Sequence, residues 1–439
     1  MDNSGLYVGL DMGTTSIKVI VAEQVKGQLN VIGVGNVRSK GLSRGIIVDI
    51  DQAADAIRSA VDQAQEKASI EIKDVIVGVP ANMLKIEPCN GLITIDESSR
   101  EITDQDVYDV SSSALITNLP QEREIIDIQP EEFIVDGFEG IKDPRGMVGV
   151  RLEMRGKVIS GAKGIMHNIA KAVSKAGLNI VSMILTPLAE SHEILNDGEQ
   201  DFGTILIDLG GGQTTASVTH DHQLKYVTTD AEGGEFITKD ISIVLNTSME
   251  NAESLKRNYG SADSLRASED RDVPVDVVGQ SEQTIIDEKY LAEIVEARID
   301  QIFGRIKGQL DAIDALSLPG GIIITGGVAA LPGIVDLAAE KFNTNVRLYV
   351  PDQMGMRHPS FSAGLSLVSY YADMSEVDML SRSAVAGSMT VVKKSSPDQT
   401  EVSNNDVSRN DAKPDKKQRQ TEKKKRGEGI RKFFNDFFE

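Results

Sequence analysis

Two stretches of the chain, about two hundred residues apart, share one pattern of apolar and polar positions. In Tyr7–Val19 an apolar run ends in an aspartate, a glycine turn with two threonines follows, and a second apolar run begins. Thr204–Val218 repeats this order, with three consecutive glycines in its turn. Each stretch predicts a buried strand, a tight turn and a second strand. The repetition predicts two related half-molecules that grip one polyphosphate from opposite sides.

The residue types in these two turns favour anion binding. Glycine lets backbone N–H groups come close to an anion, and the hydroxyls of Thr14 and Thr15 add donors. The aspartates at the two strand ends, Asp11 and Asp208, are placed to hold a divalent cation or a water. A single turn of this kind also suits an ordinary hairpin. The pair is therefore the informative feature.

A third apolar strand, within Gly321–Gly333, ends in the double glycine Gly326 and Gly327. A helix is expected to begin near Gly333 and Ile334. The glycines would let a base or ribose lie against the backbone. By itself the segment favours a βα turn of any α/β fold.

The rest of the pattern predicts an α/β protein of several parts. We expect helices at Gln52–Ala68, Val107–Thr117, His167–Ala176 and Pro187–Asn196, strands at Val75–Val79 and Asn179–Leu185, and a packed helix over Ser360–Ala372. The expected parts are a first core lobe (1–80, 164–200 and 359–382), an inserted α+β subdomain (81–163), a second core lobe (201–235 and 317–358), a mostly helical subdomain (236–316), a disordered linker (383–427) and a terminal amphipathic helix (428–439).

Composition narrows the function classes. The 439 residues hold one cysteine, Cys89, which excludes a disulfide framework and a thiolate metal cluster and fits a reducing cytosol. No signal peptide and no apolar run of about 20 residues is apparent. The net charge of −21 argues against nucleic acid as a partner. Residues 411–439 nevertheless hold ten Lys or Arg against six Asp or Glu, an excess of +4 that leaves −25 on the preceding 410 residues.

The basic end of the chain predicts a membrane anchor. Residues Ser383–Gly427 are rich in Ser, Asn, Asp, Lys and Gln and predict a flexible linker. On a helix, one face of the last residues would be apolar: Ile430, Phe433, Phe434, Phe437 and Phe438. The preceding run Lys423–Arg426 would meet anionic lipid. The alternative is a helix that docks on a partner or on the protein's own core.

The three glycine motifs, in this order, resemble the actin superfamily of ATPases. With the inserted segment, the linker and the terminal helix, the chain resembles the FtsA family of bacterial cell division. The resemblance implies an actin-like two-lobed ATPase fold with an insertion of the 1C type. It implies ATP and Mg²⁺ as ligands, filaments of the protein itself, and attachment of FtsZ filaments to the cytoplasmic side of the cell membrane at the division septum. A PilM-like pilus scaffold and a metabolite kinase of the same superfamily remain alternatives.

The resemblance also assigns roles to single residues. The phosphate, turn and adenosine-side positions are Gly13, Thr14, Thr15, Lys18, Gly210, Gly211, Gly212, Gln213, Thr214, Gly233, Gly234, Glu253, Lys256, Gly326, Gly327 and Val328. Asp11 and Asp208 would act on the reaction and hold Mg²⁺ through water. Two interpretations without a role in binding stay open: Glu253 and Lys256 could form a surface pair, and Lys18 could be a solvated strand residue.

One position departs from the superfamily pattern. Where MreB-like relatives carry a glutamate that positions the attacking water, this chain has Thr186. Glu190, one helical turn later, is the candidate substitute, with an exposed side chain as the alternative. The resemblance therefore implies at most a weak ATPase, in which ATP is mainly a structural and switching ligand.

Partner sites follow from the same resemblance. Arg298, on a helix of the second half, would receive the FtsZ C-terminal peptide, which combines acidic and apolar residues. A solvated helix face is the alternative for Arg298. Other division proteins would bind the inserted subdomain.

Overall fold

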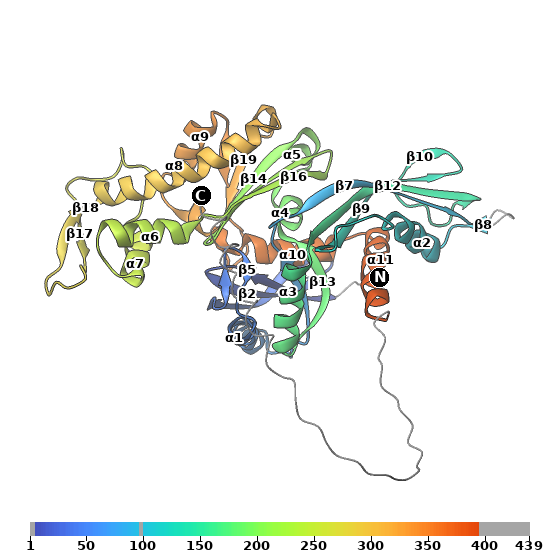
Figure 1. Ribbon diagram of the computed structural model, residues 1–439, viewed down its shortest axis with the longest axis horizontal. Helices are drawn as coiled ribbons and strands as arrows, with labels where there is room; N and C mark the ends of the chain where they lie inside the picture. The colour runs from blue at the N-terminus through green and yellow to red at the C-terminus, as the bar shows by residue number, and fades with distance from the viewer. Residues whose placement is uncertain (1–4, 96–99, 395–439) are drawn as a thin grey trace, which may run out of the picture. The chain divides into compact units, whose positions relative to one another are not determined.

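The computed structural model describes residues 5–95 and 100–394, with the backbone alone from residue 386 onward. Two five-stranded sheets, each with the same strand order, form its two lobes (Figure 1). The first sheet has the order β3 (Gln28–Arg38), β2 (Ser16–Val25), β1 (Gly5–Met12), β6 (Asp74–Val79) and β13 (Asn179–Leu185). The second has the order β16 (Gln223–Asp230), β15 (Thr214–His220), β14 (Thr204–Leu209), β19 (Ile322–Thr325) and β20 (Val346–Leu348).

In both sheets the first three strands form an antiparallel meander and the other two run parallel to the first. The predicted relation between the two halves is therefore confirmed at the level of topology. Parallel strands need a crossover segment, usually helical, and helices fill the crossovers in both lobes.

Helices cover the first sheet because its central strands are apolar on both faces. Helices α1 (Ile50–Ala68) and α3 (Lys163–Lys175) pack on one face, and α10 (Ser362–Asp373) packs on the other. Helix α1 is capped by Asp49, which accepts a hydrogen bond from the Gln52 amide. Its contact with β3 requires glycine, since a Cβ on Gly35 would lie 1.8 Å from the Ala60 carbonyl oxygen.

The second lobe carries the expected helical subdomain. Its helices are α6 (Gly234–Val244), α7 (Met249–Tyr259) and α8 (Glu288–Asp311). The α8 residues Leu291, Val295, Ile299, Phe303, Ile306 and Leu310 are buried in one core with the second sheet. The sequence did not predict the short hairpin β17 (Asp272–Val275) and β18 (Thr284–Asp287), because four-residue strands show little alternation.

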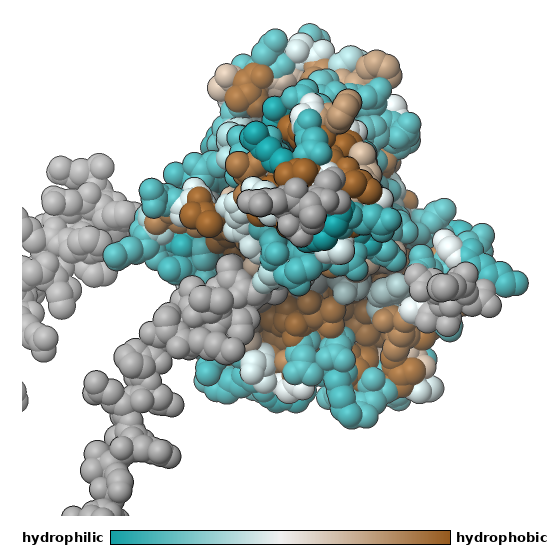
Figure 2. Space-filling view, turned by 90° about the vertical axis from the view of Figure 1, so that its right-hand side faces the viewer, coloured by the Kyte–Doolittle hydropathy of each residue, from teal (hydrophilic) through white to brown (hydrophobic). Residues whose placement is uncertain are grey.

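The inserted subdomain stands between β6 and α3, as predicted. Its sheet has the order β10 (Phe138–Ile141), β9 (Arg123–Val135), β12 (Arg151–Ala162) and β7 (Lys85–Thr94), with α2 (Asp104–Ala114) packed on it. Thr103 and Asp106 form the capping box that starts α2. Figure 2 views the molecule from the side that carries this subdomain and shows hydrophobic residues among hydrophilic ones. Leu92, Phe138 and Val148 are at least half exposed there.

The last described helix, α11 (Glu376–Lys394), corrects two boundaries. Val377 and Val385 are buried among residues of the inserted subdomain, so residues 376–382 pack with the insert and do not belong to the first lobe alone. The predicted start of the linker at Ser383 is also wrong, because it falls inside this helix. The remaining linker, the basic run and the predicted terminal helix lie outside the described residues.

Most other predicted elements are present, with shifted ends. The strand Asn179–Leu185 and the helix start at Ile334 are confirmed. Helix α4 (Thr186–Ile194) begins one residue before Pro187, which is a favourable first-turn residue. Among the described residues, no helix is long and apolar enough to cross a membrane.

Candidate functional site

The two predicted phosphate turns have the same local geometry. In the first lobe Met12 pairs with Ile17, and the Gly13 amide donates to the Ser16 carbonyl at 3.1 Å. In the second lobe Leu209 pairs with Thr214, and the Gly210 amide donates to the Gln213 carbonyl at 3.0 Å. Both predicted hairpins are therefore present.

The fold brings these two turns into direct contact. A Cβ built on Gly211 would lie 1.9 Å from Thr15 Oγ1, and one on Gly212 would lie 2.4 Å from Thr14 Oγ1. Only glycine fits opposite these hydroxyls. Within residues 5–95 and 100–394, the amides of Thr15 and Gly212 donate to no backbone carbonyl. The contact thus gathers two hydroxyls of the first lobe and one free amide from each lobe, the donors that an anion needs.

Asp11 and Lys18 form a buried ion pair at the base of the first turn. The two residues are directly opposite in the β1–β2 ladder, and Lys18 Nζ lies 3.1 Å from Asp11 Oδ2. The Lys18 side chain is 7% exposed. The alternative of a solvated strand residue is therefore wrong for Lys18.

Asp208 occupies the matching position in the second lobe, and the third glycine motif packs against it. A Cβ on Gly326, whose φ is +92°, would lie 2.1 Å from Asp208 Oδ1. Burial raises the pKa of Asp208 to about 6, Asp11 adds to the increase, and Lys18 opposes it. The first and second motifs are therefore close enough to share one electrostatic environment.

Glu190 points into the same environment from α4. Its side chain is 2% exposed, and its Oε1 has no hydrogen-bond partner among the described residues. Burial raises its pKa well above the usual value, Asp208 and Asp11 raise it further, and Lys18 opposes them. An exposed Glu190 is thus excluded, and the sequence-predicted carboxylates Asp11, Asp208 and Glu190 lie near one lysine.

The carboxylate oxygens at this site suit a cation that takes only some of its ligands from the protein and the others from water and phosphate. Among the described residues, no group of three or more His, Cys, Asp or Glu side chains is arranged to hold a metal directly. Asp11 and Asp208 do supply hard oxygen atoms beside the phosphate turns, and Mg²⁺ usually keeps waters and phosphate oxygens among its ligands. The residues present therefore fit a hydrated Mg²⁺.

The predicted adenosine-side residues also meet. Lys256 Nζ donates to the Gly234 carbonyl at 2.9 Å and pairs with Glu253 Oε2 at 2.6 Å. A Cβ on Gly234 would lie 2.8 Å from Val328 Cγ2. Burial lowers the pKa of Lys256, while Glu253 opposes the decrease. Glu253 and Lys256 therefore form a partly buried pair, with side-chain exposures of 30% and 12%, rather than a pair on an open surface. Gly327 begins a 3₁₀ turn beside this group.

Gly233 closes the second turn from the side. A Cβ on it would lie 2.4 Å from the Gly210 carbonyl oxygen, and the next two amides donate to the carbonyls of Gly210 and Gly211. Thr214 Oγ1 donates to the carbonyl of Glu232 at 3.0 Å. Hydrogen bonds thus hold the segment that follows β16 against the second phosphate turn.

The loop that carries Arg44 and Gly45 also belongs to the site, although the sequence did not predict it. The Gly45 amide donates to Thr14 Oγ1 at 2.8 Å, and a Cβ on Gly45, whose φ is +76°, would lie 2.6 Å from Gln213 Oε1. The Arg44 guanidinium lies 5.8 Å from the centre of the Phe236 ring in α6. The only signal in the sequence was the dipeptide Arg44-Gly45 before the apolar pair Ile46-Ile47, and it is weak.

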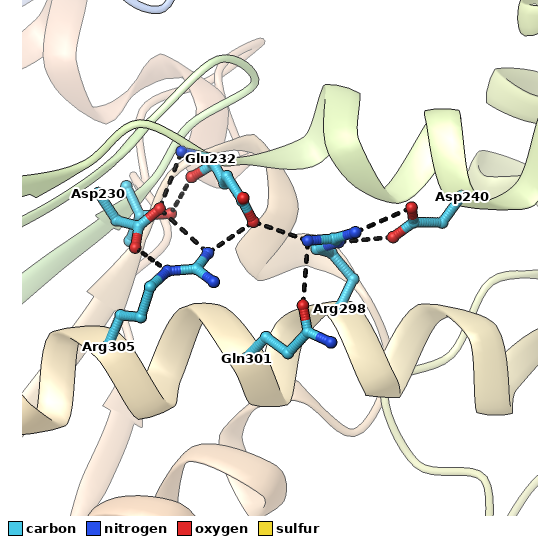
Figure 3. Close-up of polar contacts among 7 residues, drawn as sticks. Asp230, Glu232, Asp240, Arg298, Gln301 and Arg305 are labelled. Atoms are coloured by element: carbon cyan, nitrogen blue, oxygen red, sulfur yellow. Dashed lines mark hydrogen bonds and ion pairs between the residues drawn. The ribbon is translucent and has the colours of Figure 1, made fainter. Parts of the chain in front are cut away.

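Arg298 is not a free cation in this structure. Its guanidinium makes two hydrogen bonds to Asp240, at 2.5 and 2.9 Å, and one to Glu232 Oε2 at 2.8 Å (Figure 3). The solvated-face alternative therefore does not describe Arg298. A partner carboxylate would have to replace one of these intramolecular acceptors.

Comparisons with known proteins identify relatives of this arrangement. A family profile described as "Cell division protein FtsA" matches residues 205–366, and one described as "SHS2 domain inserted in FTSA" matches residues 81–160. The Cell division protein FtsA of Enterococcus hirae is 55% identical over 438 residues, which cover 100% of this chain and 99% of that relative. That of Bacillus subtilis (strain 168) is 41% identical over 370 residues, with 84% of each chain covered.

Solved structures support the fold. The PilM–PilN type IV pilus biogenesis complex matches with a TM-score of 0.59 at 14% identity, over 84% of this chain and 99% of that one. MreB5 of Spiroplasma citri bound to ADP matches with a TM-score of 0.50 at 11% identity, with the same coverage. At such identities the likeness concerns the fold alone, and it confirms the predicted actin-like architecture with an inserted subdomain.

Proposed function

This chain belongs to the FtsA family of cell division proteins, and on that premise we propose that it binds Mg-ATP between its two lobes. The observation that carries the proposal is the contact between Thr14 and Thr15 of one turn and Gly211 and Gly212 of the other. Two homologous turns that meet offer backbone and hydroxyl donors to one polyphosphate from both sides. Lys18 supplies the fixed positive charge beside it.

The carboxylates would divide the chemistry between them. Asp11 and Asp208 would hold a hydrated Mg²⁺, and that ion would supply positive charge against the phosphates. Glu190 accepts a proton from an attacking water, since it is the buried carboxylate without a partner at Oε1. Glu190 must be ionised to act as a base, but burial and the neighbouring carboxylates favour its protonated form. We therefore propose slow ATP hydrolysis and a mainly structural role for ATP.

On the adenosine side, we assign recognition to the partly buried group of Gly234, Glu253, Lys256, Gly327 and Val328. Lys256 and Glu253 supply polar atoms, and Val328 supplies an apolar contact beside a backbone without a side chain at Gly234. This combination of an apolar wall and a few fixed polar groups is typical of small-molecule sites.

At the level of the cell, we propose that the protein forms filaments on the cytoplasmic side of the membrane and anchors FtsZ there. The support for the anchor is the apolar face and basic run of the terminal segment. An acidic FtsZ peptide would bind the α8 face by exchanging with Asp240 or Glu232 at Arg298. Exposed Leu92, Phe138 and Val148 support the inserted subdomain as a site for other division proteins.

Two other functions make different predictions. A PilM-like scaffold would bind nucleotide but would not require the terminal segment to associate with anionic vesicles. A metabolite kinase would need an acceptor site and rapid phosphoryl transfer. Sedimentation with anionic vesicles, with and without residues 428–439, separates the proposed function from both.

The nucleotide site is tested by substitution at its closest contact. Gly211→Val should abolish Mg-ATP binding in a fluorescence titration, because even its Cβ would collide with Thr15. Asp208→Ala should weaken binding or turnover by loss of the cation's ligand. The matched control is Gly308→Val on α8, where a Cβ meets nothing within 4 Å. Wild-type affinity in both Gly211→Val and Asp208→Ala would refute the proposed site.

A further inference from the structure

An ion-pair cluster connects helix α8 to the end of strand β16. Arg305 pairs with Asp230 and, at 2.5 Å, with Glu232 Oε2. The same Glu232 oxygen accepts a hydrogen bond from Arg298 Nη1, and Arg298 in turn holds Asp240 and Gln301 (Figure 3). Glu232 is therefore the shared carboxylate between two arginines of one helix face. Such charge-assisted bonds are roughly twice as strong as neutral ones.

Glu232 is also covalently next to the backbone that closes the second phosphate turn. Its own amide donates to Asp230 Oδ1 at 2.9 Å, and its carbonyl accepts from Thr214 Oγ1 at 3.0 Å. The two residues that follow are Gly233 and Gly234, whose close approach to Gly210 and Gly211 is described above. A shift of the Glu232 side chain would therefore move backbone that touches the turn.

The cluster also reaches the first lobe. The Arg298 guanidinium lies 5.9 Å from the centre of the Phe236 ring, and Arg44 of the first lobe lies 5.8 Å from the same ring. Arg44 precedes Gly45, the residue that donates to Thr14. A continuous set of contacts thus joins the second turn, α8 and the first turn.

We infer that Glu232, held between Arg298 and Arg305, is a positioning residue for the second phosphate turn. The glycines permit the close approach of the turn to an anion, but a chain rich in glycine does not fix its own conformation. The two arginines supply that fixation from a rigid helix. The inference rests on the proposed nucleotide site and adds that this site is set from α8.

The test compares two substitutions of the same kind in the full-length protein. Glu232→Gln removes the shared charge while keeping the side-chain shape, and Glu293→Gln makes the same change at an exposed α8 position. We expect Glu232→Gln to weaken Mg-ATP affinity about 5- to 20-fold, a range typical of coupled sites. Its thermal midpoint should stay close to that of Glu293→Gln, which should bind like wild type.

Two further measurements separate positioning from general destabilisation. Hydrogen exchange on nucleotide-free protein should be faster at residues 210–213 and 233–235 in Glu232→Gln but unchanged in the core of the inserted subdomain. Arg305→Lys keeps the positive charge but lacks the planar guanidinium that bonds two carboxylates at once. The Arg305→Lys protein should therefore bind Mg-ATP better than Arg305→Gln and less well than wild type.

The outcomes are distinguishable. Wild-type affinity and exchange in Glu232→Gln, together with Mg-ATP binding by wild type, would overturn the inference and leave the proposed function intact. Absence of Mg-ATP binding by wild type would overturn the proposed function, and the exchange data alone would then show whether Glu232 fixes the turn. Faster exchange throughout the protein would assign Glu232 a merely structural role and overturn the inference.

Discussion

At the scale of single residues, the buried carboxylates beside the two phosphate turns outnumber Lys18, the lysine that opposes their charge. Asp11 pairs with Lys18, whereas Asp208 and Glu190 are buried beside that pair and have raised pKa values. Buried carboxylates of this kind favour ligands that bring positive charge or protons. The cluster therefore explains why a cation should accompany a phosphate ligand here.

Substitution of Glu190 separates hydrolysis from stability. Glu190→Gln should lower single-turnover ATP hydrolysis by roughly 10²–10⁴-fold, the usual contribution of a general base, while Mg-ATP still binds. Because the folded-state pKa of Glu190 is raised, the native state holds the extra proton, and its stability falls as pH rises through that pKa.

The nucleotide-free Glu190→Gln protein should consequently unfold at a higher temperature than wild type near neutral pH. The difference should shrink as pH falls toward the ordinary glutamate pKa of about 4.3. Calorimetric scans across this pH range measure it. Equal hydrolysis rates for the two proteins would exclude Glu190 as the base.

At the scale of elements, α11 is joined to the inserted subdomain by a buried ion pair. Arg382 Nε lies 2.6 Å from Asp127 Oδ1, with side-chain exposures of 12% and 1%. Ser381 of the same helix hydrogen-bonds Ser111 of α2 at 3.0 Å. The helix is thus fixed to the insert by polar as well as apolar contacts.

Breaking this pair from one side should be costly. Arg382→Met leaves the Asp127 carboxylate buried without its cation and should destabilise the protein by about 3–5 kcal/mol, measured by chemical denaturation. Arg382→Met with Asp127→Asn should recover part of that loss, because no uncompensated charge remains. A single variant as stable as wild type would show that Asp127 finds another partner or protonates at no cost.

The terminal segment gives a prediction for a further element. Phe437→Glu should release the protein from anionic vesicles, because the apolar face would carry a charge. Asn435→Glu, on the predicted polar face, adds the same charge and should reduce flotation only slightly. Nucleotide binding should be unchanged in both. Added salt should weaken wild-type flotation without abolishing it, since burial of apolar surface is not screened. Equal flotation of Phe437→Glu and wild type would favour a partner-docking helix.

At the scale of the whole molecule, the actin-like fold together with the proposed nucleotide site predicts nucleotide-dependent assembly. Filaments should appear on anionic lipid monolayers with Mg-ATP or a non-hydrolysable analogue, by negative-stain electron microscopy. The Gly211→Val protein should form none under the same conditions, because the Cβ at residue 211 collides with Thr15 and should abolish nucleotide binding. Monomers at all nucleotide and protein concentrations would contradict assembly.

Residues close together in the sequence determine much of the local structure of this site. The apolar run, the aspartate and the glycine turn lie within a dozen residues, so hairpin register and turn geometry follow from nearest neighbours, and both hairpins formed as predicted. The same holds for the strand Asn179–Leu185 and the helix from Ile334. The order of these local motifs indicated the actin superfamily, and the inserted segment, the linker and the terminal helix narrowed the resemblance to the FtsA family.

Only the tertiary structure decided which of these segments meet. Contact of Thr15 with Gly211, burial of Glu190 beside Asp208, and the pairing of Arg298 with Glu232 each join residues far apart in the chain. The tertiary structure also decided where α11 packs, because its apolar residues do not indicate which hydrophobic core they join. A periodic pattern indicates that one face of an element is buried. It does not indicate which residues cover that face, because the packing of whole elements against one another selects them.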